Sequence, residues 1–65
     1  MTLDEIKATV EAGKTVHWST TLYSVVRDRM GRWFILCTSN GSAIGLTWLD
    51  GKTLNGKVED FFGKD

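Results

Sequence analysis

Apolar residues recur at helical spacing in the first part of the chain and alternate with polar residues after that. Apolar side chains three and four positions apart predict an amphipathic helix over about residues 2–12, and they are Leu3, Ile6 and Val10. Thr2 followed by Glu5 is a capping-box pattern at its start. Gly13 is the expected end, because glycine takes a left-handed conformation with little strain.

After the helix, the pattern changes to that of strands: "KTVHWST" alternates with period two, "LYSVVRD" is rich in β-branched and aromatic residues, and "RWFILCT" is apolar on both faces. We predict strands over about residues 14–19, 22–28, 32–38 and 43–48. The connections are short, and Asn40-Gly41 is the strongest hairpin signal among them. Strands joined in this way pair with their neighbours, so the sequence predicts an antiparallel meander.

The last segment of the chain allows two interpretations. Residues 54–62 fit a turn or a fifth short strand, and in both cases Phe61 and Phe62 are expected to attach the segment to the core. The predicted fold is therefore α+β, with an N-terminal helix packed on a four- to five-stranded antiparallel meander sheet. At 65 residues, the chain is expected to be a single compact domain over 1–65.

The small size of the chain raises the question of what stabilises it. A domain of this length buries only roughly 60% of the surface of its unfolded chain. The single cysteine excludes an internal disulfide, and Cys37 with the single histidine cannot complete a zinc site. Three Trp, three Phe and one Tyr are many rings for such a chain. We therefore expect a homo-oligomer that buries some of them between subunits.

Charge and hydropathy restrict the partners. Eight basic and eight acidic side chains give a net charge of zero, so nucleic acid is not an expected partner. No apolar run reaches the roughly 20 residues that cross a bilayer, and the first residues lack a secretory-signal pattern. We expect a cytoplasmic protein without membrane contact.

Few residues suit catalysis. His17 is expected to face away from the core and Cys37 to lie in it, which keeps the only imidazole and the only thiol apart. The glycines fall in hairpin turns rather than between a strand and a helix, so there is no phosphate-binding loop of the Walker or dinucleotide type. The sequence predicts no enzyme, no cofactor and no metal site.

A first candidate binding region follows Gly45. A glycine inside a strand pattern marks a bulge, or a place where another backbone or a ligand comes close. Trp48 then offers a flat ring, and Lys52 and Asn55 offer donors that suit phosphate or a base edge. The alternative is a twisted sheet whose hairpins need glycine for their turns alone.

A second candidate region depends on strand register. Tyr23 and Arg27 share one face of their strand, and register decides whether His17 joins them. If it does, stacking and an arginine would bind a nucleobase and its phosphate. If it does not, Tyr23 is a core ring and Arg27 is solvated. The candidate ligand-binding residues are His17, Trp18, Tyr23, Arg27, Trp48, Lys52 and Asn55.

The stretches "LDEIKATVEAGKTVHW" and "GLTWLDGKTLNGKVEDFF" resemble small proteins of unknown function carried by bacteriophages and prophages. The helix that ends at Gly13-Lys14 and leads into the strand is also similar to the start of phage anti-defence proteins that sequester cyclic nucleotide signals in the Thoeris and CBASS systems. The central strands share no motif with those proteins. The resemblance implies a compact oligomer in the cytoplasm of a bacterial host that holds its ligand between subunits and does no chemistry.

Three functions are therefore considered. The first is a non-catalytic phage-type binding protein, an anti-defence sponge that sequesters a nucleotide-derived signal at subunit interfaces. The second is a small protein-interaction module that inhibits or adapts a host or phage protein through a sheet face or edge. The third is a small nucleic-acid-binding protein, whose affinity would fall steeply as salt rises.

Overall fold

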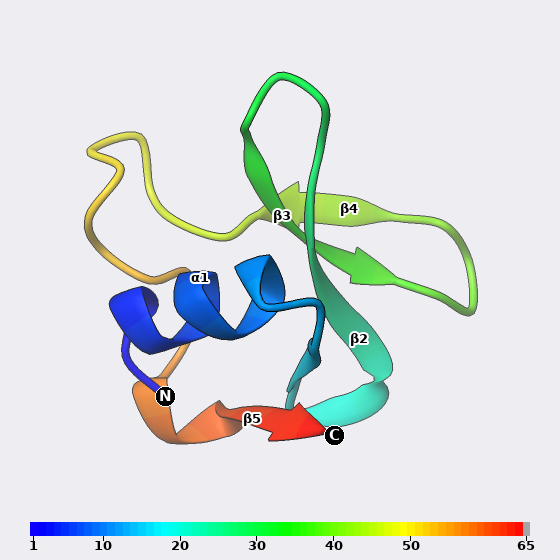
Figure 1. Cartoon of the computed structure of the whole chain (residues 1–65). Helices are drawn as coiled ribbons and strands as arrows, with labels where there is room; N and C mark the ends of the chain where they lie inside the picture. Colours follow the sequence, from blue (N-terminus) through cyan, green and yellow to red (C-terminus); the bar gives the residue numbers. More distant parts are fainter. Residues whose placement is uncertain (65) are drawn as a thin grey trace.

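The computed structural model describes residues 1–64, with side chains described as far as Gly63. One N-terminal helix is followed by a five-stranded antiparallel sheet, so the predicted α+β fold is confirmed. Helix α1 (Leu3–Glu11) lies over one face of the sheet, which we call the inner face, and the segment that follows strand β4 runs beside it (Figure 1). This helix is too short to cross a membrane, and no other helix in the described part of the chain could do so.

Helix α1 begins where the capping box was predicted. The Thr2 N–H donates to Oε1 of Glu5 at 2.8 Å, and the Glu5 N–H donates to Oγ1 of Thr2 at 3.3 Å, so two donors of the first turn are satisfied reciprocally. Gly13 follows the last turn at φ +86°, as expected for a helix stop. Ile6 points from the helix to the sheet and is fully buried.

The sheet has the strand order β4-β3-β2-β1-β5. The strands are β1 (Thr15–Trp18), β2 (Thr20–Arg27), β3 (Trp33–Cys37), β4 (Ala43–Gly45) and β5 (Phe61–Lys64). The first four form the predicted antiparallel meander. Strand β5 does not extend it beyond β4 but pairs with β1 at the opposite edge.

The predicted fourth strand over 43–48 is wrong beyond Gly45. The chain bends back there, and a Cβ on Gly45 would lie 3.2 Å from the Thr47 carbonyl oxygen. The Asn55 side-chain amide also donates to the Gly45 carbonyl at 3.3 Å. The close approach expected at this glycine is therefore made by the protein's own backbone.

The C-terminal segment combines both predicted forms. A 3₁₀ turn (Val58–Asp60) precedes β5, which continues past the expected end at residue 62. Phe61 is buried, but Phe62 is 39% exposed, so its predicted place in the core is wrong. The reason is the alternation of strand side chains, which sends adjacent residues to opposite faces.

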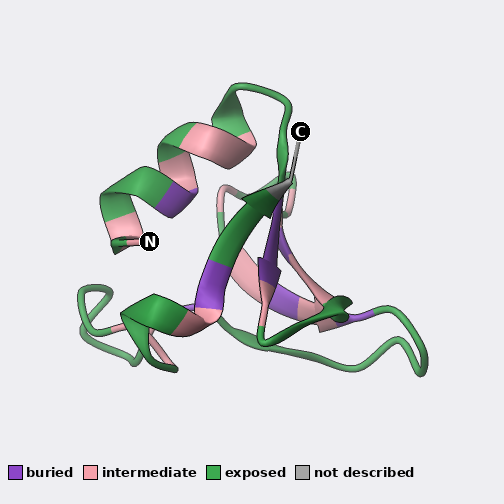
Figure 2. Cartoon of the chain, turned by 90° about the horizontal axis from the view of Figure 1, so that it is seen from below, coloured by how far each residue is buried: buried purple, intermediate pink, exposed green. Residues whose placement is uncertain are grey.

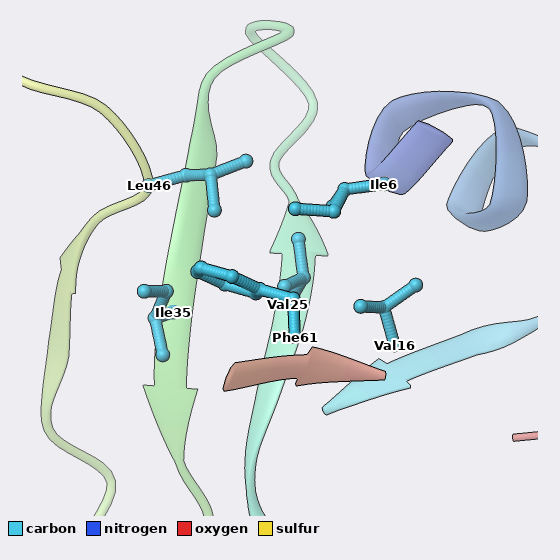
Figure 3. Packing of buried hydrophobic residues seen from close by; sticks show 6 residues of the cluster. All are labelled: Ile6, Val16, Val25, Ile35, Leu46 and Phe61. Carbon is cyan, nitrogen blue, oxygen red and sulfur yellow. The ribbon is translucent and has the colours of Figure 1, made fainter. Parts of the chain in front are cut away.

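Buried side chains from the helix, four of the five strands or their flanks, and the loop after β4 form one core. Figure 3 shows its six members, which are Ile6, Val16, Val25, Ile35, Leu46 and Phe61. Cys37 is buried as predicted. Exposed residues dominate the loops and the outer side of the helix (Figure 2). The core therefore lies between α1 and the inner face of the sheet.

Candidate functional site

Two neighbouring open hollows lie where the loop after β4 passes the first turns of α1 and the start of β3. The first, the aromatic hollow, has a volume of about 480 Å³, and its walls include Lys7, Arg32, Trp33, Phe34, Trp48 and Leu49. The second, the lysine hollow, has a volume of about 450 Å³, and its walls include Thr2, Asp4, Lys7, Gly51 and Lys52. Lys7 and Gly51 line both hollows, so the two are adjacent. Each volume falls within the range of roughly 300–1,000 Å³ that is usual for ligand sites.

Positive charges lie against the rings of the aromatic hollow. Nζ of Lys7 is 5.8 Å and Cζ of Arg27 is 5.7 Å from the centroid of the Trp33 ring. Cζ of Arg32 is 5.8 Å from the centroid of Phe34. These distances are within the reach of cation–π attraction. No acidic side chain is among the residues that line this hollow, so the hollow suits an anion that carries a flat ring.

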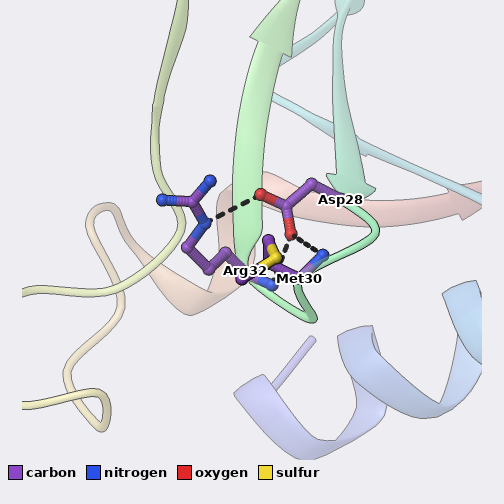
Figure 4. Close-up of polar contacts among 3 residues, drawn as sticks. All are labelled: Asp28, Met30 and Arg32. Carbon is purple, nitrogen blue, oxygen red and sulfur yellow. Dashed lines mark hydrogen bonds and ion pairs between the residues drawn. The ribbon is translucent and has the colours of Figure 1, made fainter.

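The turn before β3 fixes the position of Arg32. Oδ1 of Asp28 accepts hydrogen bonds from the backbone N–H groups of Met30 at 2.9 Å and Arg32 at 2.8 Å, and Nε of Arg32 donates to Oδ2 at 2.8 Å (Figure 4). Burial opposes ionisation of Asp28, but the hydrogen bonds and charge of Arg32 lower its pKa. The ion pair is made through Nε of Arg32 and does not use the outer guanidinium nitrogens.

Residues 47–53, which we call the cleft loop, present Trp48. The Trp48 N–H donates to the Thr53 carbonyl at 2.9 Å, which closes the loop. Asp50 shapes its tip, and hydrogen bonds from the N–H groups of Thr53 and Lys52 and from the Thr53 hydroxyl lower the pKa of Asp50. The loop is thus closed by polar contacts, and Trp48 stays 64% exposed.

Four of the predicted site residues lie in or near this region. Trp48 lines the aromatic hollow and Lys52 lines the lysine hollow. Arg27 lies on the ring of Trp33, which is part of the wall. Asn55 holds the Gly45 carbonyl, so its amide supports the loop that carries Trp48.

The other three predicted residues lie elsewhere. His17 pairs with Ser24, which places it on the face opposite to Tyr23 and Arg27. Its Nδ1 donates to the Tyr23 carbonyl at 2.9 Å, and the Phe62 ring lies 5.5 Å away. The predicted cluster of His17, Tyr23 and Arg27 is therefore not formed.

Trp18 and Tyr23 are packing residues of the inner face. Their ring centroids are 5.0 Å apart in an edge-on arrangement, and the Phe61 ring is 6.4 Å from that of Trp18. Neither residue lines either hollow. The alternative prediction for Tyr23, that its ring belongs to the core, is the one that the structure supports.

Lys7, Arg32 and Trp33 were not among the predicted site residues. The arginine-rich turn before β3 was the available signal for Arg32. No local pattern marks Lys7, because its role depends on the helix lying beside the start of β3.

The fold and the hollows define a small α+β domain with an open aromatic and cationic cleft. Neither a known family model, a curated protein nor a solved structure matches the chain. Within residues 1–64, no three His, Cys, Asp or Glu side chains gather so that they could hold a metal ion.

Proposed function

We propose that the protein is a non-catalytic binding protein that captures a nucleotide-like anion in its aromatic hollow. The observation that carries this proposal is the wall of the hollow, where Trp33, Phe34 and Trp48 stand beside Lys7 and Arg32 and no acidic side chain is among the lining residues. Asp28 lies behind Arg32, where it accepts from Nε. Aromatic rings stack on nucleobases, and cationic side chains bind phosphate by charge-assisted hydrogen bonds. The lining residues include no histidine, cysteine or carboxylate, which favours capture over conversion.

A homo-oligomer is part of this proposal. Trp48 and Leu49 stand at the rim of the hollow, with Leu49 fully exposed and Trp48 64% exposed. A hollow of this kind holds a ligand only weakly, because much of the ligand stays in water. A second copy that covers the two apolar side chains would enclose it. The resemblance to phage anti-defence proteins supports the role of a sponge for a nucleotide-derived signal in the host cytoplasm.

Calorimetric titration of the purified protein tests the proposal. The ligands are adenosine, the mononucleotides of the four bases, cyclic nucleotides and ADP-ribose, with inorganic phosphate as the ring-free control. We expect at least one nucleotide to bind and Trp48→Ala to weaken it by about tenfold, since stacking contributes about 1–3 kcal/mol per base. Leu22→Ala is the matched control, because Leu22 is exposed on β2 outside both hollows.

Two outcomes would contradict the proposal. One is the absence of heat and of thermal stabilisation with every nucleotide. The other is an equal loss of affinity in the Trp48 and Leu22 variants. Native mass spectrometry with and without the bound nucleotide tests the oligomer, and a lone subunit that still holds the nucleotide would remove that part of the proposal.

A protein-interaction module is the second candidate. Exposed Trp and Leu side chains on a hydrogen-bonded loop are the kind of anchor that fills a pocket on a partner. In that case Trp48→Ala and Leu49→Ala would both abolish capture of one partner from host lysate, and no nucleotide would bind.

A further inference from the structure

The lysine hollow gives the cleft a second positive end. Lys7 is half-buried and lines both hollows, while Lys52 is exposed and lines only the second. Arg32 and Lys7 line the hollow that would hold the ring of a ligand. Lys7 and Lys52 line the adjacent hollow. Lys7 is thus shared by the two, with one further cation on each side.

We propose that this arrangement selects nucleotides with two or more phosphoryl groups over nucleoside monophosphates. The inference rests on the proposed function and adds the class of ligand. Arg32 and Lys7 suffice for the phosphoryl group next to the nucleoside. Lys52 has its ammonium free of the cleft loop's own hydrogen bonds, which use only its backbone N–H, so its side chain binds the next phosphoryl group.

The negative groups around the lysine hollow weaken the attraction of its lysines for a second phosphoryl group. Asp50 lies next to the hollow in sequence, but its carboxylate accepts hydrogen bonds from its own loop at 2.8 to 3.0 Å. Asp4 lines the wall itself and repels a phosphate there. Two lysines against one aspartate leave a net positive wall, and removal of Asp4 should strengthen binding of the second phosphoryl group.

The test compares AMP with ADP, which share the ring and the sugar and differ by one phosphoryl group. Titrations are made without divalent cations at low salt. The wild-type protein should bind ADP about three- to tenfold more tightly than AMP, as expected for one added charge-assisted contact at an exposed site. Because such contacts are screened, the ratio should shrink as salt is raised.

Three variants assign the preference to the lysine hollow. Lys52→Ala should remove most of the ADP preference, because it weakens ADP binding more than AMP binding. Asp4→Asn should raise the preference by about two- to threefold. Lys57→Ala is the matched control, since Lys57 is an exposed lysine a few residues further along that lines neither hollow.

The outcomes separate this inference from the proposed function. Equal affinity for AMP and ADP, with both lost in Trp48→Ala, would contradict the role proposed for the lysine hollow. The role proposed for the aromatic hollow would stand. An equal effect of Lys57→Ala and Lys52→Ala would also overturn it, because the preference would then reflect net charge alone. If neither nucleotide binds, both proposals fail.

Discussion

Leu46 and Leu49 are the same residue type three positions apart, and the fold treats them in opposite ways. Leu46 is fully buried in the core, whereas Leu49 is fully exposed at the rim of the aromatic hollow. The Leu46 N–H still donates to the Trp33 carbonyl at 3.1 Å, as a strand residue would. Beyond Leu46, Asp50 and Thr53 hold the chain through hydrogen bonds within the cleft loop.

This contrast separates the parts of the molecule that stabilise the fold from those free to bind. The core residues lose their water on folding, and that burial drives folding. The cleft loop is ordered by polar contacts, so Trp48 and Leu49 keep apolar surface in water. Binding a ligand or a partner can then bury surface that folding has left exposed.

Leu46→Ala should produce the largest effect, because it removes a fully buried side chain. Truncation of a buried leucine to alanine costs about 2–5 kcal/mol. A domain of this size has a free energy of unfolding of only about 3–5 kcal/mol from its core. We therefore expect a large unfolded fraction at 25 °C, measured by urea denaturation followed by circular dichroism.

Leu49→Ala is the matched control for that measurement. The side chain is fully exposed, and exposed substitutions change the free energy of unfolding by about 0.5 kcal/mol or less. Similar losses in the two variants would mean that the cleft loop packs on the core, and the contrast between the two leucines would then be wrong.

The same contrast explains which elements could be predicted from the sequence. The helix follows from its capping box and apolar spacing, and the first strand follows from alternation. The next two strands follow from β-branched and aromatic residues and from an apolar run, and all of these patterns record burial. Residues 46–48 continue the alternation but leave the sheet, since the side chains of Asp50 and Asn55 bind the backbone of the loop. Such side-chain contacts compete with strand pairing and leave no periodic signal.

The site was less predictable because it joins segments far apart in sequence. Trp48 and Lys52 were identified from their own segment, as a flat ring after Gly45 and a donor on a flexible turn, and both line the hollows. Lys7 lies on a helix flank that resembles any solvated face. The cluster around His17 depended on register, and the bulge between His17 and Trp18 shifts the pairing of β1 with β2.

Gly56→Ala should have the next largest effect and tests where the segment after the cleft loop meets the core. Gly56 lies at φ +154°, and a Cβ there would be 2.7 Å from Nε1 of Trp18. That nitrogen is buried and has no hydrogen-bond partner among the described residues, and the added methyl group would have to displace the Trp18 ring. Strain and displacement together predict a loss of about 2–3 kcal/mol in urea denaturation.

Gly51→Ala separates the two causes. Gly51 also has positive φ, at +70°, but nothing lies within 4 Å of the added Cβ. Backbone strain alone predicts a loss of about 1 kcal/mol. If the two glycine variants are equally stable, contact with Trp18 does not contribute to the loss of stability in Gly56→Ala.

Low pH should destabilise the fold, because it protonates carboxylates that accept hydrogen bonds in the folded state. The backbone N–H groups of Thr53 and Lys52 lower the pKa of Asp50 in the folded state, and Thr2 lowers that of Glu5 in the same way. A carboxylate whose pKa is lowered on folding stabilises the fold at pH values above its pKa in the unfolded chain, which is 3.8 for Asp50. This contribution is lost as the pH falls through the pKa in the folded state. The urea concentration at the midpoint of unfolding should therefore decrease as the pH is lowered below about 4. Asp50→Asn should flatten that fall, and an unchanged pH profile would contradict the role of Asp50.

Trp48→Ala should have the smallest effect on stability, although it removes the largest type of side chain. The Trp48 ring is 64% exposed and lies against the open hollow rather than in the six-residue core. Its loss should change the free energy of unfolding by about 0.5 kcal/mol or less. Acrylamide quenching of the indole fluorescence should fall clearly in this variant, because Trp18 and Trp33 are only partly exposed. A loss above about 1 kcal/mol would show that the ring stabilises the fold, and the division between a core that folds and a loop that is free to bind would not hold at Trp48.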